Sequence, residues 1–139
     1  MTGHADLDAF LERPFTAMIA TIRADGTPHQ VPVWYRWDGE AFLVWTDDGR
    51  AWFRNLLRDD RASIAVFESS PPWGAAIARG RATHRTGDDP EILAECRRIV
   101  ERYVPATEVD GVLARWVKGP QTIVRIEPDA MSAWAEQTG

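Results

Sequence analysis

Residues 18–63 read MIATIRADGTPHQVPVWYRWDGEAFLVWTDDGRAWFRNLLRDDRAS, and this stretch decides the fold. Asp25-Gly26 and Asp38-Gly39 separate three runs of apolar, β-branched and aromatic residues, which is a strong signal for tight hairpins. Residues 50–58, RAWFRNLLR, then replace the alternating pattern with helical spacing. The stretch therefore predicts an antiparallel sheet that is interrupted by one short cationic helix. Because the amino end of a helix presents free amide groups, such a helix is a candidate anion site.

The flanking sequence extends this pattern in both directions. The expected helices are residues 5–12, 88–103 and about 108–117, and the expected strands are 15–23, 29–37, 41–46, 62–68, 75–86 and 121–127, with 131–135 extending the last one beyond Pro128. Six antiparallel strands with helices inserted between them predict a mainly β fold, a small closed or nearly closed barrel within a single domain, residues 1–139. A barrel of this size fills its interior with side chains, so a ligand is expected outside it or between subunits.

Two features of the second strand and the short helix suggest where a ligand would lie. Pro32 cannot donate a hydrogen bond to a neighbouring strand, so the sheet is expected to bulge or open there. The chain has seven tryptophans, most of which we expect to pack in the core or in a dimer contact. Trp34 and Trp52 are expected to be the exposed exceptions. Arg50 and Arg54, one helical turn apart, are the candidate anion contacts, although a solvated amphipathic helix explains their spacing equally well.

Composition excludes several classes of protein. The formal net charge of −5 argues against a nucleic-acid partner, and no apolar run approaches the length of a membrane span. Of 16 basic residues, Lys118 is the only lysine, and genome composition is the simplest cause of that bias. Cys96, the only cysteine, has no disulfide or metal partner in the sequence and is expected to lie in a helix core. The amino-terminal residues lack the pattern of a secretory signal, so we expect a cytoplasmic protein.

The sequence offers no catalytic residues and no metal ligands. His4, His29 and His84 are far apart and belong to no known catalytic motif, and neither a Walker loop nor a Rossmann glycine pattern is present. His29 on an alternating strand is expected to be satisfied or solvent-facing. An enzyme with these residues would therefore take its chemistry from a cofactor.

Several blocks of the sequence, in order and spacing, resemble the pyridoxamine 5′-phosphate oxidase-like split β-barrel superfamily. The chain is most similar to the short flavin/deazaflavin oxidoreductases of the B type, and the resemblance covers nearly its whole length. The blocks that carry it are Ala20–His29, Val31–Tyr35, Thr46, Arg54–Ser63 and Arg79–Ala82.

The resemblance implies a six-stranded antiparallel split β-barrel that forms a homodimer with two cofactor sites at the subunit interface. It implies FMN or the deazaflavin coenzyme F420 as cofactor, without deciding between them. The ring would lie against Val31, Pro32, Val33 and Trp34, and the phosphate would be held by Thr46, Arg50 and Asn55. Relatives that bind the deazaflavin commonly have a lysine at the position of Trp52, so here either Arg50 or Arg54 would compensate or Trp52 would stack on a ring.

Three hypotheses about function follow. The first is a flavin- or F420-dependent oxidoreductase that passes a hydride between the cofactor and a small planar unsaturated substrate. The second is a non-catalytic binder or carrier of FMN, deazaflavin or a haem-like ligand. The third is a structural dimer that has lost its cofactor site.

Overall fold

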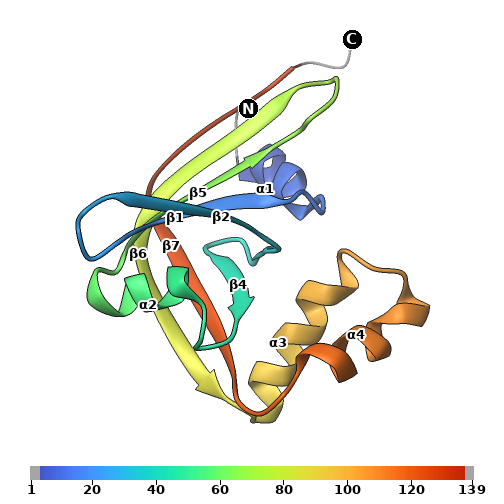
Figure 1. The fold of residues 1–139 in the computed structure, drawn as a ribbon. Coiled ribbons are helices and arrows are strands. Elements are labelled where there is room, and N and C mark those ends of the chain that lie inside the picture. The colour runs from blue at the N-terminus through green and yellow to red at the C-terminus, as the bar shows by residue number, and fades with distance from the viewer. Residues whose placement is uncertain (1–3, 137–139) are drawn as a thin grey trace.

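The computed structural model describes residues 4–136 and the side chains from residue 6 onward (Figure 1). The helices are α1 (His4–Glu12), α2 (Ala51–Arg58), α3 (Pro90–Glu101) and α4 (Val109–Trp116), with a short 3₁₀ turn at Ala106–Glu108 before α4. The strands are β1 (Ala17–Ile22), β2 (Pro28–Val33), β3 (Arg36–Trp37), β4 (Phe42–Thr46), β5 (Arg61–Phe67), β6 (Gly74–Gly87) and β7 (Gln121–Ala135). These elements confirm the mainly β class with inserted helices and all the expected helix positions, to within two residues at most ends.

The seven strands form one antiparallel sheet in the order β2-β1-β5-β6-β7-β4-β3. Strands β2 and β3 are therefore the two opposite edges of the sheet, yet they follow one another in the chain. Only Trp34 and Tyr35 separate them, and that connection spans at most about 11 Å. The sheet must consequently roll until its edges lie near each other, and because β2 and β3 do not pair, the rolled sheet is split between them.

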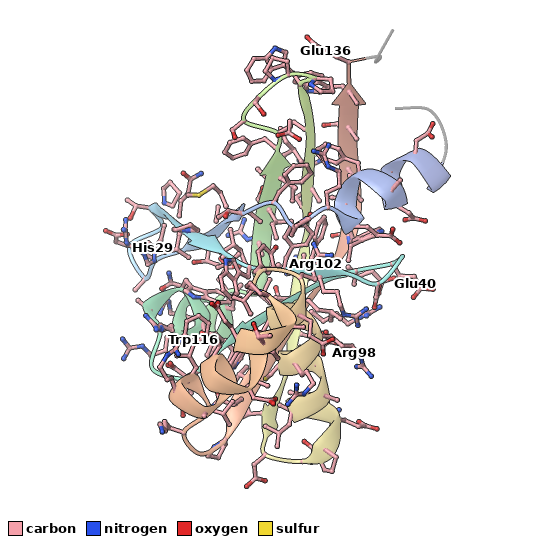
Figure 2. The ribbon with its side chains drawn as sticks, turned by 90° about the vertical axis from the view of Figure 1, so that its right-hand side faces the viewer. His29, Glu40, Arg98, Arg102, Trp116 and Glu136 are labelled. Carbon is pink, nitrogen blue, oxygen red and sulfur yellow. The ribbon has the colours of Figure 1, made fainter. Side chains whose placement is uncertain are left out.

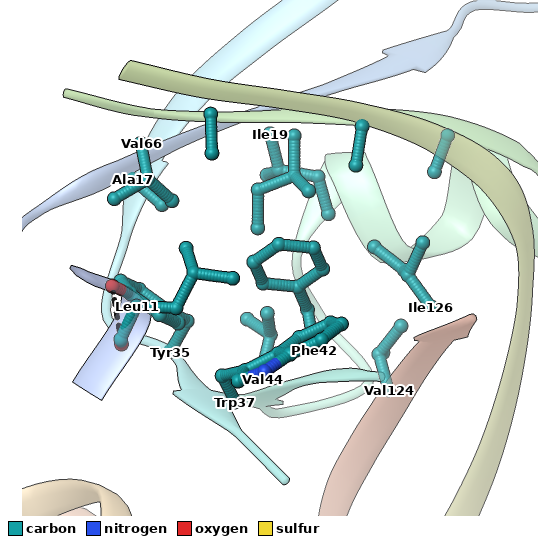
Figure 3. Packing of buried hydrophobic residues seen from close by; sticks show 14 of the residues in the cluster. Leu11, Ala17, Ile19, Tyr35, Trp37, Phe42, Val44, Val66, Val124 and Ile126 are labelled. Atoms are coloured by element: carbon teal, nitrogen blue, oxygen red, sulfur yellow. Dashed lines mark hydrogen bonds between the residues drawn. The ribbon is translucent and has the colours of Figure 1, made fainter. Parts of the chain in front are cut away.

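The roll encloses the hydrophobic core. Phe42 lies at the centre of the core, where its ring is 4.8 Å from the ring of Trp37 and 5.8 Å from that of Tyr35 (Figure 3). Helix α1 closes one end with Leu11, which is fully buried. Side chains fill this interior, as the sequence predicts for a small barrel.

The predicted second strand differs from the observed structure in two ways. It is two strands, β2 and β3, which is why the sheet has seven strands rather than six. The chain leaves the ladder at Tyr35 because the phenol oxygen of Tyr103 accepts a hydrogen bond from the Tyr35 backbone N–H at 3.2 Å. Of the two alternatives expected at Pro32, the bulge is wrong, since the pairing of β1 with β2 runs unbroken through Met18 and Pro32, and the opening is correct, since β2 is an edge of the sheet. Proline is tolerated there because β2 is an edge strand.

Two further expectations concern the later part of the chain. The predicted strand 121–127 and its extension 131–135 form one strand, β7, and the register shift beside β6 falls at Arg79/Gly80, close to Pro128. Cys96 is fully buried in α3, as expected, and burial raises the pKa of its thiol to about 12. The Cys96 thiol therefore stays protonated and unreactive.

Helices α3 and α4 lie beside the barrel (Figure 1). Charged contacts near both ends of α3 attach it to the rest of the fold. The guanidinium of Arg36 on β3 makes two hydrogen bonds of 2.6 Å to the carboxylate of Glu95 on α3. At the other end of α3, Arg102 donates to the backbone oxygens of Glu12 and Arg13, at 2.9 and 3.1 Å. These charged contacts tie α3 both to the sheet edge and to the end of α1.

Within residues 4–136, no helix combines the length and apolarity needed to cross a bilayer.

Candidate functional site

A cleft of about 770 Å³ lies where the sheet is split. Strand β2 forms one side, the end of β4 and the start of α2 form the floor, and α3 and α4 contribute the opposite side. Seven of the eight predicted cofactor contacts line this cleft, and Asn55 does not: the seven are Val31, Pro32, Val33, Trp34, Thr46, Arg50 and Trp52. The residues that the sequence pointed to are thus brought together around one hollow.

The β2 side of the cleft is a ridge of short apolar side chains. Val31 and Val33 are half-buried and pack against the core, while Pro32 between them is exposed. Because β2 is an edge strand, its outer rim is free of a neighbouring strand among the described residues. A flat ligand can therefore approach this strand closely.

The start of α2 provides the cationic part of the cleft. Arg50 is the residue that precedes the helix, in an extended conformation, and no side chain of the described residues caps the amide groups of the first turn. Its guanidinium lies 3.6 Å from the Asp47 carboxylate, and the Arg50 side chain is 68% exposed. An exposed pair of this kind contributes about 0–1 kcal/mol, so Arg50 can leave Asp47 for a better anion at little cost. Arg54, one turn further on, does not line the cleft.

Trp52 departs from the expectation of an exposed aromatic residue. It is only 6% exposed and belongs to the hydrophobic core cluster, although it also borders the cleft. Its indole therefore serves mainly to fix α2 on the barrel, and little of it is available to stack on a ligand ring. The sequence prediction for Trp52 is wrong because the amphipathic spacing of 50–58 places this residue on the buried face of α2.

Trp34 is half-buried, and its partners explain why. Its ring stacks on that of Tyr103 with centroids 4.6 Å apart and planes 4° apart. The Tyr103 hydroxyl donates to the backbone oxygen of Phe15 at 2.7 Å, and burial raises the pKa of this phenol. Tyr103 therefore holds the Trp34 ring in one orientation at the edge of the cleft.

Helix α4 adds an aromatic wall that the sequence analysis missed. Trp116 packs at tilted angles against Trp34 and Trp45, with ring centroids 5.5 and 5.9 Å away, and is 48% exposed. Trp45 donates from Nε1 to the Gln121 side-chain oxygen at 2.8 Å. Residues 115–116 lie more than 50 positions beyond the end of α2, and no local pattern indicates that α4 returns to the cleft. The residues lining the cleft that the sequence did not single out as ligand contacts are His29, Trp45, Asp47, Ala51, Ile99, Arg115, Trp116 and Gln121.

Asn55, the eighth predicted contact, lies below the cleft surface. Its side-chain amide is buried, donates to Thr21 Oγ1 at 3.0 Å and lies 3.3 Å from His29 Nδ1. Its oxygen accepts a hydrogen bond of 3.0 Å from Arg58. The structure therefore gives Asn55 the position of a residue that organises its neighbours rather than one that faces the hollow. Figure 2 shows His29 and Trp116 on the same side of the molecule, where both line the cleft.

A second hollow of about 720 Å³ lies between α3 and strands β4, β6 and β7. Its arginines all have carboxylate partners: Arg85 with Glu91 at 2.8 Å, Arg98 with Glu95 at 3.5 Å and Arg125 with Asp38 at 2.7 Å. None of the predicted site residues lines it. It is therefore a weaker candidate for an anionic ligand than the cleft at the split.

Among residues 4–136, no group of three or more histidine, cysteine or acidic side chains is arranged to hold a metal ion.

Comparison with known proteins gives two results. The family model described as "Pyridoxamine 5'-phosphate oxidase" matches residues 4–135. Among solved structures, a conserved hypothetical protein from Mycobacterium tuberculosis has a TM-score of 0.77 and 26% identity, with 97% of this chain and 86% of that chain covered.

Two other solved structures are also similar. A protein named F420 reductase has a TM-score of 0.69 and 27% identity, over 90% of this chain and 94% of that one. The haem storage protein HutZ from Vibrio cholerae has a TM-score of 0.70 at 17% identity, over 94% and 92% of the two chains. The likeness to HutZ concerns the fold alone.

Proposed function

Because the chain belongs to the pyridoxamine 5′-phosphate oxidase family, we propose that it is a flavin- or deazaflavin-dependent oxidoreductase whose cofactor binds in the cleft at the split. The observation that carries the proposal is the convergence of β2, Thr46 and Arg50 on a single hollow. The likeness to an F420 reductase at 27% identity supports a cofactor of this general kind. FMN and F420 both remain candidates.

The cleft fits the chemical parts of such a cofactor. Its volume of about 770 Å³ lies within the range of about 300–1,000 Å³ typical of small-molecule sites. The ridge Val31–Val33 and the fixed face of Trp34 offer a flat apolar contact for a ring. The uncapped start of α2 and Arg50 offer amide donors and a positive charge for a phosphate. Since the lysine common in F420-binding relatives is Trp52 here, the charge-assisted contact falls to Arg50.

The residues of this chain would act by positioning rather than by acid–base chemistry. A bound flavin or deazaflavin would supply the capacity to donate or accept a hydride, which no side chain of the cleft provides. Val31, Pro32 and Val33 would set the position of the ring, and Arg50 would anchor the charged tail. Trp116, which packs against Trp34 and Trp45 at the wall of the cleft, would exclude water from the bound ring.

We propose that the protein functions as a homodimer and that it is located in the cytoplasm. Phe67, Ile77 and Trp134 are 48, 52 and 53% exposed on three neighbouring strands, β5, β6 and β7. The sheet register places them on one face, because Ala75 pairs with both Phe67 and Trp134, and Ile77 lies two residues further along the same strand. An uncovered apolar face of this kind is characteristic of a subunit contact. The lone buried cysteine accords with a reducing compartment.

A carrier of a planar ligand is the second candidate. It is favoured by the composition of the cleft, where aromatic and aliphatic side chains predominate. Among the described residues that line it, Asp47 is the only carboxylate, and it is 51% exposed at the rim. Such a site binds a ring well but offers few groups to promote turnover.

Binding and turnover measurements test the proposal and separate the two candidates. Titration of the purified protein with FMN and with F420, followed by fluorescence quenching, is expected to give saturable binding of at least one of them, with one cofactor per chain. The reduced complex is then mixed with a panel of planar unsaturated substrates under anaerobic conditions, and oxidation of the cofactor is followed by absorbance. Light scattering on the same sample is expected to give twice the mass of one chain.

Saturable binding with substrate-dependent oxidation supports the oxidoreductase. Tight binding without oxidation by any substrate favours the carrier. If neither FMN nor F420 binds, the oxidoreductase is contradicted and the carrier is restricted to a haem-like ligand. If haem does not bind either, only the structural dimer is left.

A further inference from the structure

We infer that His29 presents a fixed N–H donor, at Nε2, to the ligand of the cleft, and that Asn55 is the residue that fixes it. This inference rests on the proposed function for the nature of the ligand. His29 then contacts the ligand directly, and the hydrogen-bonded side chains of Thr21, Asn55 and Arg58 beside it fix the orientation of its ring.

The first step is the placement of the three side chains. Thr21 on β1 and His29 on β2 are directly paired across the sheet, so their side chains project to the same face. Helix α2 lies against that face, and its Asn55 side chain contacts both Thr21 and His29. The amide nitrogen of Asn55 lies 3.0 Å from Thr21 Oγ1 and 3.3 Å from His29 Nδ1, which uses both of its hydrogens.

The second step is the orientation of the Asn55 amide. Arg58 lies on the other side of the amide, where its Nη2 is 3.0 Å from Asn55 Oδ1 and 3.1 Å from the backbone oxygen of Ile22. A guanidinium group can only donate, so the atom of Asn55 that faces Arg58 must be the oxygen. The nitrogen is therefore the atom that faces His29.

The third step is the state of the imidazole. Since the Asn55 nitrogen only donates, His29 Nδ1 must accept, and an accepting ring nitrogen carries no proton. The neutral ring consequently carries its hydrogen on Nε2. His29 is half-buried and lines the cleft, and with Nδ1 occupied by Asn55, Nε2 is the nitrogen left for a ligand.

The chemistry of the partner follows from this donor. The neighbouring wall of β2 is apolar, so a neutral N–H group there selects an acceptor in the plane of a ring, such as a carbonyl oxygen or an unprotonated ring nitrogen. Arg50, from the start of α2, serves the charged end of the ligand instead. A planar heterocycle with an in-plane acceptor and an anionic tail satisfies both groups.

Nitrogen-15 NMR of the free protein, labelled at histidine, tests the tautomer directly. Three histidines contribute, and the His29 signals are assigned by their loss in His29→Gln. The wild type at a pH where the ring is neutral is expected to show a protonated Nε2 and an unprotonated Nδ1. In Asn55→Asp, which keeps the size of the side chain but replaces the donor with an acceptor, the pattern is expected to reverse. An Nδ1–H tautomer in the wild type would overturn the inference.

Cofactor affinity tests the role of the donor, with whichever of FMN and F420 binds the wild type. His29→Phe and Asn55→Asp are each expected to weaken binding about tenfold, the weight of one hydrogen bond. His29→Gln, whose amide nitrogen reaches the position of Nε2, is expected to bind within about threefold of the wild type, and circular dichroism checks the fold of each variant. Equal affinity of His29→Phe and wild type would overturn the inference. If the wild type binds neither cofactor, the proposed function fails, whereas the nitrogen spectrum still decides whether the donor is fixed.

Discussion

Replacing Arg36 with methionine is expected to lower the free energy of unfolding by about 2–3 kcal/mol, less than the roughly 3–5 kcal/mol of a fully buried ion pair, because the Arg36 side chain is 26% exposed. The Glu95 side chain is 10% exposed and receives two hydrogen bonds of 2.6 Å from the Arg36 guanidinium. Without Arg36, this carboxylate keeps only Arg98, which is 3.5 Å away and 57% exposed. In the variant, the Glu95 carboxylate therefore stays largely buried on α3 with little positive charge to compensate it.

Chemical denaturation in urea measures the effect, and two variants control it. Arg85→Met removes an arginine whose pairs with Asp89 and Glu91 are exposed, and its expected cost is below about 1 kcal/mol. The double variant Arg36→Met with Glu95→Met removes both charges and is expected to recover most of the lost stability. If Arg36→Met is as stable as Arg85→Met, then the pair does not hold α3 on the sheet.

Reversing the charge of Arg50 is expected to have the largest effect on ligand binding. Loss of a charge-assisted hydrogen bond costs about 1.5–3 kcal/mol, which is roughly a factor of 10 to 150 in affinity. A glutamate at position 50 adds repulsion of the phosphate and lies beside Asp47, so Arg50→Glu is expected to weaken cofactor binding at least about 100-fold.

Arg54→Glu is the matched control for this prediction, since it makes the same change of charge one turn along α2, at a residue that does not line the cleft. It is expected to weaken binding less than about fivefold. Isothermal titration at two salt concentrations measures both variants, and the wild-type affinity is expected to fall as salt screens the Arg50 contact. Equal losses for the two variants would mean that only the general charge of α2 matters.

The sheet is largely predictable from local signals, and its split is not. The turns at Gly26 and Gly39 have φ angles of +87° and +98°, so the Asp-Gly pairs placed the hairpins where the backbone requires glycine. The alternation of residues 29–37 suggested one continuous strand. It ends early because Tyr103, 68 residues away, bonds the backbone of Tyr35. No pattern within a strand can reveal a partner at that distance.

The residues of the candidate site were likewise only partly predictable from local sequence patterns. Pro32 and Arg50 were identifiable because a proline in a strand and an arginine before a helix carry their own chemistry, whereas Val31, Val33 and Thr46 came only from the family resemblance. Trp52 was assigned the wrong exposure because its place near the start of α2 suggested an open position, whereas the amphipathic spacing of 50–58 puts it on the buried face of the helix. Trp116 and His29 line the cleft because of the way α4 and β2 pack around it, and only the tertiary structure determines that packing.

The most direct test of the account is the crystal structure of the protein with bound FMN or F420, whichever binds more tightly. The account predicts electron density for the ring along Val31–Trp34, a phosphate within hydrogen-bond distance of Arg50, and two chains joined through the face that carries Phe67, Ile77 and Trp134. Density for the cofactor in the hollow beneath α3, with the cleft at the split left empty, would contradict it.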